Sequence, residues 1–239
     1  MYLRTSRLAL GLLLGSAVMC ASPITYTWVS WTSATLSTGI SMGTASGSFT
    51  IGSTPVTVTY TGDLSSATEV NCGSCVNYYT PTSIYENSTV ANLPTTADIL
   101  TLDENPAYTD TITFSSPVMN PVLDIVSLGY SGGTVYYNFE GGATPVILSQ
   151  GSAYWGGCST CLSVSGSSLA GTEGSGVIEF VGTFTSLTFT TTNGEDWNGF
   201  TVGVEALGSP SVPEPATWRL CLIATLLAVP IIVWRRRRA

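Results

Sequence analysis

The chain has 239 residues, a mean hydropathy of +0.33 and a formal net charge of −8 at pH 7. It contains no histidine, and its seven basic residues all lie near the two ends: Arg4, Arg7, Arg219 and Arg235 to Arg238. Ser–His and Cys–His nucleophiles are therefore excluded, and the long middle of the chain offers no cationic clamp for phosphate. Its acidic charge also argues against nucleic acid as a partner.

The first 21 residues are typical of a signal peptide. Arg4 and Arg7 precede an apolar stretch from Leu8 to Met19, and the small residues of Cys20-Ala21-Ser22 follow. A basic start, a short apolar helix and a small-residue cleavage region predict export, and the stretch is too short for a lasting membrane span. Cys20 leaves a lipoprotein interpretation open.

Residues 22–207 show the alternation of β-strands. Apolar residues alternate with threonine in several runs, and glycine-rich turns separate many of them. This pattern predicts one all-β ectodomain, an antiparallel two-sheet sandwich with a jelly-roll-like arrangement. The expected strands are Ser48–Ile51, Val56–Tyr60, Thr111–Phe114, Leu123–Leu128, Thr134–Phe139, Val146–Ser149, Val177–Val181, Leu187–Thr190 and Phe200–Val204.

The carboxyl groups of this ectodomain have no cationic side chain to pair with. All of the 15 acidic residues except Glu214 lie between Asp63 and Glu205, where Lys, Arg and His are absent. Most should be solvated surface groups. Any that is buried must accept hydrogen bonds from the backbone, bind a cation, or keep its proton with a raised pKa.

Four cysteines form two Cys-x-x-Cys pairs, Cys72 with Cys75 and Cys158 with Cys161. An exported protein meets an oxidising compartment, so disulfides are the first interpretation, with local or crossed pairing left open. A four-thiolate zinc site and a redox-active pair are the alternatives.

Two turn-rich loops carry tryptophan, and the second also carries side-chain oxygens. They contain Trp155 in the first and Glu195, Asp196, Trp197 and Asn198 in the second. Aromatic faces with polar groups suit sugars, and loop oxygens suit calcium, so these five residues form a candidate ligand or calcium site. The structural alternative is that the tryptophans, with Trp28 and Trp31 on a shared strand face, close the ends of the sandwich.

Catalysis has few candidates in this inventory. Glycoside hydrolysis needs only two carboxyl groups, and the pairs Asp103-Glu104 and Glu195-Asp196 could provide them from loops. Surface turn acids explain both pairs more simply, so we expect no enzyme activity and no cofactor, with calcium as a candidate ion.

The C-terminal 32 residues have three parts. Residues 208–217 form a linker with Val-Pro-Glu-Pro-Ala-Thr at its end, and residues 218–239 contain an apolar run followed by Arg235, Arg236, Arg237 and Arg238. The prolines predict an extended, accessible motif. The apolar run is long enough to cross a membrane as a helix, and the arginines predict a cytoplasmic C-terminus.

These three parts, in this order, resemble the PEP-CTERM sorting tail of exported bacterial proteins. The resemblance implies recognition by an exosortase, a membrane protease, through Pro213, Glu214 and Pro215. It also implies an association with exopolysaccharide. We therefore expect a membrane-anchored precursor that is processed and reaches the cell surface or extracellular matrix.

Three functions remain open for the ectodomain. The first is a structural or adhesive surface protein, which the sorting tail favours. The second is a calcium-assisted carbohydrate-binding module whose partners are exopolysaccharide or other surface glycans. The third is a two-carboxylate glycosidase.

Overall fold

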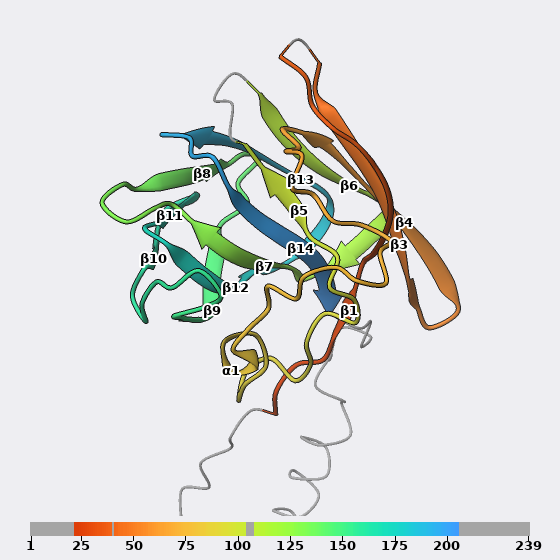
Figure 1. Cartoon of the computed structure of the whole chain (residues 1–239). Coiled ribbons are helices and arrows are strands. Elements are labelled where there is room, and N and C mark those ends of the chain that lie inside the picture. Colours follow the sequence, from red (N-terminus) through yellow and green to blue (C-terminus); the bar gives the residue numbers. More distant parts are fainter. Residues whose placement is uncertain (1–21, 40, 104–107, 206–239) are drawn as a thin grey trace, which may run out of the picture.

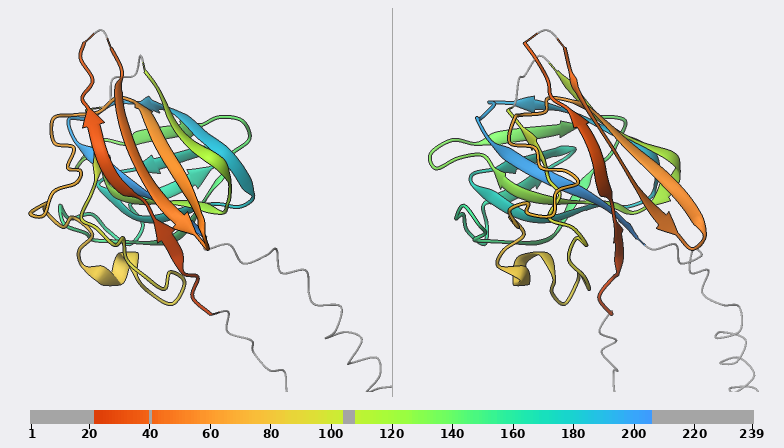
Figure 2. Two further views of the ribbon diagram at one scale, coloured as in Figure 1. Left: turned by 90° about the vertical axis from the view of Figure 1, so that its right-hand side faces the viewer. Right: turned by 45° about the vertical axis from the view of Figure 1, so that its right-hand side comes forward.

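The computed structural model describes residues 22–39, 41–103 and 108–205 (Figure 1). These residues form two antiparallel sheets whose inner faces share one hydrophobic core, which is the β-sandwich that the alternation predicts. Figure 2 shows the two layers from two further directions. All nine expected strands are present, each within or overlapping an observed strand.

The first sheet has six strands in the order β1-β14-β7-β12-β9, and β5 lies beside β1 along the same edge of β14. Its central strands are buried along their whole length, because both faces of this sheet are covered. Its strands are β1 (Tyr26–Trp28), β5 (Leu100–Leu102), β7 (Pro121–Leu128), β9 (Pro145–Gly151), β12 (Gly174–Phe180) and β14 (Asn198–Glu205).

The second sheet has eight strands in the order β10-β11-β8-β13-β6-β4-β3-β2. Burial alternates along β3 and β4, since one face meets the core and the threonines and serines of the other face meet solvent. Its strands are β2 (Ser30–Thr35), β3 (Gly43–Ile51), β4 (Thr54–Gly62), β6 (Thr109–Met119), β8 (Val135–Phe139), β10 (Leu162–Ser165), β11 (Ser168–Gly171) and β13 (Thr183–Thr192).

The segment between β4 and β5 covers the outer face of the six-stranded sheet and forms a second hydrophobic cluster with it. It contains one helical turn, α1 (Thr82–Tyr85), which the sequence gives no sign of. Tyr85 is fully buried, and its hydroxyl donates a hydrogen bond of 3.3 Å to the carbonyl oxygen of Ile125 in β7. This covering segment explains why the six-stranded sheet has two buried faces.

Trp28 and Trp31 do not share a strand face, so that expectation is wrong. The chain leaves the six-stranded sheet after Trp28 and enters the eight-stranded sheet at Ser30. Trp28 packs in the outer cluster, and Trp31 packs in the core between the sheets. An odd separation along an extended chain also points two side chains to opposite sides. Both rings are nevertheless buried, whereas the ring of Trp155 is 55 % exposed, so the four tryptophans do not all close the sandwich.

Several carboxyl groups are buried in this domain. Because no cationic side chain is present to pair with them, they accept hydrogen bonds or have a raised pKa. Asp110 Oδ1 accepts hydrogen bonds from the Tyr60 hydroxyl at 2.5 Å and from the backbone N–H of Asp63 at 2.9 Å. Burial nevertheless raises the pKa of Asp110 to about 6. Asp124 is fully buried, neither carboxyl oxygen has a hydrogen-bond partner among the described residues, and burial raises its pKa well above the ordinary value.

Candidate functional site

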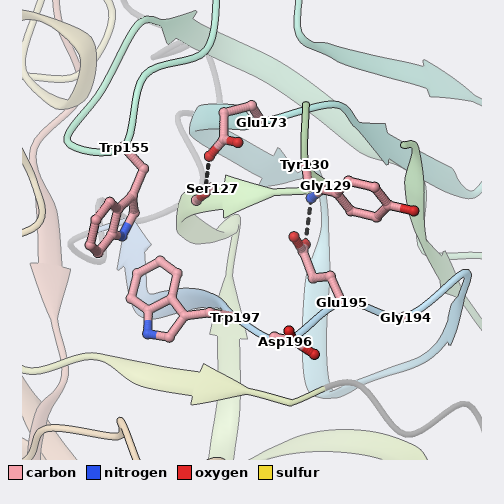
Figure 3. A pocket seen from close by; sticks show the side chains of 9 residues that line it. All are labelled: Ser127, Gly129, Tyr130, Trp155, Glu173, Gly194, Glu195, Asp196 and Trp197. Carbon is pink, nitrogen blue, oxygen red and sulfur yellow. Dashed lines mark hydrogen bonds between the residues drawn. The ribbon is translucent and has the colours of Figure 1, made fainter. Parts of the chain in front are cut away.

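Four loops meet at one end of the six-stranded sheet and enclose a pocket of about 610 Å3 (Figure 3). They connect β7 to β8, β9 to β10, β11 to β12 and β13 to β14. Because these strands are antiparallel neighbours, β7 and β9 end where β12 and β14 begin, and distant loops are brought together. The pocket is lined by Ser127, Gly129, Tyr130, Trp155, Glu173, Gly194, Glu195, Asp196 and Trp197.

An aromatic cluster of Tyr78, Tyr154, Trp155 and Trp197 forms one side of the pocket and continues behind it. Trp155 is 55 % exposed, and its ring centroid lies 5.8 Å from that of Trp197 in an edge-to-face arrangement. Tyr78, from the covering segment, packs against both indoles with centroid distances of 6.3 Å and 5.1 Å. The rings brace one another, so an exposed indole face is held ready for a ligand.

Two glycines allow the loops around the pocket to approach one another closely. Gly129 has φ +79°, and a Cβ atom there would lie 2.1 Å from the carbonyl oxygen of Gly171. Gly157, two residues after Trp155, has φ +89°, and its Cβ would lie 2.1 Å from the carbonyl oxygen of Glu173. A side chain at either position would push the loops apart.

Glu195 closes the β13–β14 loop against the β7–β8 loop. Its Oε1 atom accepts hydrogen bonds from the backbone N–H of Gly129 and from Asn198 Nδ2, the latter at 3.2 Å. Its pKa is raised to about 7, chiefly by burial; the negative charges of Glu173 and Asp196 add to the rise, and these two hydrogen bonds oppose it. Glu195 is therefore only partly ionised at neutral pH.

Glu173 and Asp196 add two more carboxyl groups to the pocket. Glu173 Oε1 accepts a hydrogen bond from the hydroxyl of Ser127, which orients this side chain. Asp196 is exposed at the pocket rim. In Figure 3 the indoles lie together on one side, and the carboxyl groups of Glu173 and Glu195 lie across from them. The pocket can thus offer an apolar ring face and hydrogen-bond acceptors to the same ligand.

The structure gathers four of the five predicted ligand residues into this one pocket: Trp155, Glu195, Asp196 and Trp197. Asn198 lies behind them. It is fully buried at the start of β14, where its Oδ1 accepts a hydrogen bond from the Tyr137 hydroxyl and its Nδ2 donates to Glu195. Asn198 therefore positions Glu195 and does not line the pocket.

Sequence reasoning missed Glu173, Tyr130 and Tyr78. Glu173 stands in a glycine-rich turn, and Tyr130 follows a strand, so neither has a distinctive local pattern. Tyr78 belongs to the covering segment, which has few repeating features. Glu173 is distinguished by a positive φ of +60°, but this backbone angle is seen only in the folded structure and not in the sequence.

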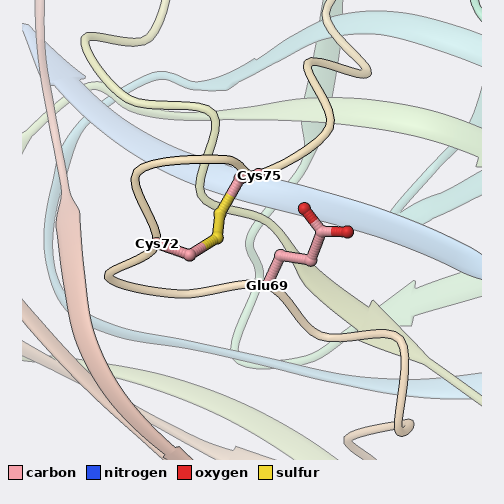
Figure 4. Close-up of side chains that lie close together, drawn as sticks. All are labelled: Glu69, Cys72 and Cys75. Carbon is pink, nitrogen blue, oxygen red and sulfur yellow. A yellow bond between two sulfur atoms is a disulfide. The ribbon is translucent and has the colours of Figure 1, made fainter.

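Metal-ligand geometry points elsewhere in the molecule. Histidine, cysteine, aspartate and glutamate are the side chains considered as metal ligands. Among the described residues, one group of three has its ligand atoms within 4.8 Å of one another: Glu69, Cys72 and Cys75 (Figure 4). Its two cysteines are joined in a disulfide, so their thiolates are not free to bind an ion. The Glu69 carboxylate instead accepts a hydrogen bond of 2.7 Å from the backbone N–H of Val76.

Both cysteine pairs are local disulfides. Cys72 is bonded to Cys75 and Cys158 to Cys161, with Cα–Cα distances of 5.4 and 5.1 Å. The first ring lies three residues before Tyr78, and the second lies three residues after Trp155. Each disulfide thus constrains a loop that supplies part of the aromatic cluster.

The predicted sorting signals lie outside the described residues. These are the signal peptide at residues 1–21, the motif Pro213, Glu214 and Pro215, and the apolar run with Arg235 to Arg238. Within residues 22–39, 41–103 and 108–205, no helix is both long and apolar enough to span a membrane. Comparisons with protein-family profiles, curated proteins and solved structures find no match to this chain.

Proposed function

We propose that this chain is an exported bacterial surface protein whose β-sandwich binds glycans in the pocket between Trp155 and Glu195. The observation that carries the proposal is the exposed indole of Trp155, braced by other rings, beside hydrogen-bonding carboxyl groups in a pocket of about 610 Å3. Sugars are bound by this combination, because their C–H faces stack on aromatic rings while their hydroxyl groups need polar partners.

The position of the pocket suits display at a surface. β14 begins at the pocket with Asn198 and ends at Glu205, roughly 25 Å away at about 3.3 Å per residue. Glu205 pairs with Tyr26 of β1, so both ends of the described domain lie at the end of β14 that is remote from Asn198 and the pocket. A C-terminal anchor would therefore be attached at the end of β14 that is remote from the pocket.

The rest of the proposal rests on the sequence. A signal helix would direct export, a single C-terminal transmembrane helix would hold the precursor, and an exosortase would process it at Pro213–Pro215. A jelly-roll-like arrangement of the strands belongs to the same proposal. The mature protein would then act as an adhesive or structural component that attaches to exopolysaccharide or other surface glycans.

A glycan array with the secreted protein, in the presence and absence of calcium, tests the binding role. Trp155→Ala should abolish binding, because it removes the exposed ring that a sugar would cover. Val181→Ala is the matched control, since Val181 is 66 % exposed and follows the end of β12 that is remote from the pocket. An array with no bound glycan in either condition would reject the proposal.

A second candidate, hydrolysis of a glycan, is favoured by one observation. The pKa of Glu195 is raised to about 7, where a carboxylic acid can donate a proton at neutral pH. However, Oε1 of this carboxyl is engaged by Gly129 and Asn198, which gives it a structural role in closing the loop. Turnover of a bound polysaccharide that is lost in Glu195→Gln would place hydrolysis ahead of binding.

A further inference from the structure

We infer that the pocket selects glycans that carry a free ammonium group, and so prefers amino sugars over neutral, N-acetylated or acidic sugars. This inference rests on the proposed function and specifies the substrate class of the same site. It follows from three carboxyl groups that line one aromatic pocket in a domain without cationic side chains.

The charge of the pocket is uncompensated. Glu173, Glu195 and Asp196 all line it, and residues 22–205 contain no Lys, Arg or His that could neutralise them. The hydrogen bonds of Glu173 and Glu195 use Oε1 in each case, and their donors are the neutral groups of Ser127, Gly129 and Asn198. A ligand that brings a positive charge would supply what the protein lacks.

The mutual repulsion of these carboxyl groups also favours a positively charged ligand. The negative charges of Glu173 and Asp196 both raise the pKa of Glu195, so the three groups interact electrostatically across the pocket. An ammonium group in the pocket would reduce this repulsion, whereas a uronate or sulfated sugar would add to it. A neutral sugar would stack on the indole without either effect.

The aromatic side of the pocket favours the same ligand. Trp155 exposes more than half of its surface, and Trp197 meets it edge to face, so an indole face remains open beside the carboxyl groups. Such a face binds the C–H surface of a sugar ring and also attracts a cation. A pocket of about 610 Å3 is larger than a small cation alone requires and can admit one or two sugar rings.

The test compares three oligosaccharides of equal length by isothermal titration calorimetry with the mature secreted protein. They are a β-1,4-linked glucosamine oligomer, its N-acetylated form and an oligogalacturonate. At a pH where the amine is protonated, the glucosamine oligomer should bind on the order of tenfold more tightly than the N-acetylated form, and oligogalacturonate should bind weakest. Its advantage should shrink as salt increases, because the charges involved are near the surface.

Variants separate the pocket from general attraction to an acidic protein. Asp196→Asn should reduce the preference for glucosamine, because it removes an exposed pocket charge. Glu140→Gln removes an exposed acid at the far end of β8 and should leave the preference unchanged. Trp155→Ala keeps the net charge, so glucosamine binding that survives in this variant would overturn the inference by revealing non-specific attraction.

The two proposals fail in different ways. Equal or tighter binding of the N-acetylated oligomer, lost in Trp155→Ala, would overturn the ammonium preference and leave glycan binding in place. Absence of binding by all three oligomers and by the glycan array would overturn both.

Discussion

Replacing Asp110 by asparagine should remove about 3 kcal/mol of the pH dependence of folding stability. The pKa of Asp110 rises from 3.8 to about 6 in the folded protein, because the side chain is buried away from water. Each pKa unit corresponds to about 1.36 kcal/mol, which gives about 3 kcal/mol for this group. Asparagine retains Oδ1 as an acceptor for the Tyr60 hydroxyl and the Asp63 N–H, so the local hydrogen bonds can persist.

The sign of the effect follows from proton binding. Between pH 3.8 and about 6, the folded protein holds the Asp110 proton while the unfolded chain has lost it. The folded state therefore binds more protons in this range, and stability must fall as pH rises. The contribution is fully present below the unfolded pKa and is lost once pH passes about 6. Burial also raises the pKa values of Asp124 and Glu179, which act in the same direction.

Urea unfolding, followed by tryptophan fluorescence at about pH 3 and about pH 7, measures the difference. Wild type should lose at least about 3 kcal/mol between these pH values, and Asp110→Asn should lose about 3 kcal/mol less than wild type. Glu140→Gln, at an exposed position, should retain the wild-type slope. A wild-type stability that is constant or increases toward neutral pH would refute the reasoning, as would an unchanged slope in Asp110→Asn.

Three further outcomes are expected. Asp124→Asn should change stability more favourably at neutral pH than at acid pH, because a fully buried carboxyl without a hydrogen-bond partner among the described residues is removed. The same unfolding curves measure this, and an equal loss of stability at both pH values would contradict it. For a glycan with a trimethylammonium group, calorimetry should show tighter binding as pH rises through about 7, where Glu195 loses its proton, and Glu195→Gln should lose this dependence. Mass spectrometry of the mature protein should find two blocked cysteine pairs and a C-terminus near Pro213–Pro215; free thiols, or an intact arginine cluster, would contradict one part or the other.

The sequence reveals the strands whose environment is simple. In β3 and β4, one face meets the core and the other meets water, so apolar residues and threonine alternate strictly. The sequence does not reveal β5, β10 or β11, since three or four residues are too few to show a period. It also does not reveal α1, whose single turn is stabilised by tertiary contacts of Ile84 and Tyr85.

The pocket could be predicted only in pieces. Trp155 and Trp197 each stand in a turn-rich loop, which marks both as candidates, but no local pattern says that the two loops meet. Their proximity depends on the strand order β14-β7-β12-β9, which places the start of β14 and the end of β9 at the same end of one sheet. Long-range pairing of this kind is decided by the packing of both sheets. The sequence therefore did not predict that Glu173 and Tyr78 lie at the site.

The lack of cations connects the stability of this domain with its binding chemistry. Inside the fold, Asp110 and Asp124 can avoid unpaired charge by keeping their protons, and this solution becomes costly as pH rises. At the pocket, Asp196 is exposed and must stay hydrated or meet a cation from outside. Glu195 is partly buried and, with a pKa of about 7, is partly protonated at neutral pH. A cationic ligand would neutralise the pocket without protonating it. A permanently cationic ligand would therefore bind more tightly at neutral pH, where the empty domain is less stable than in acid, and binding would offset part of that loss.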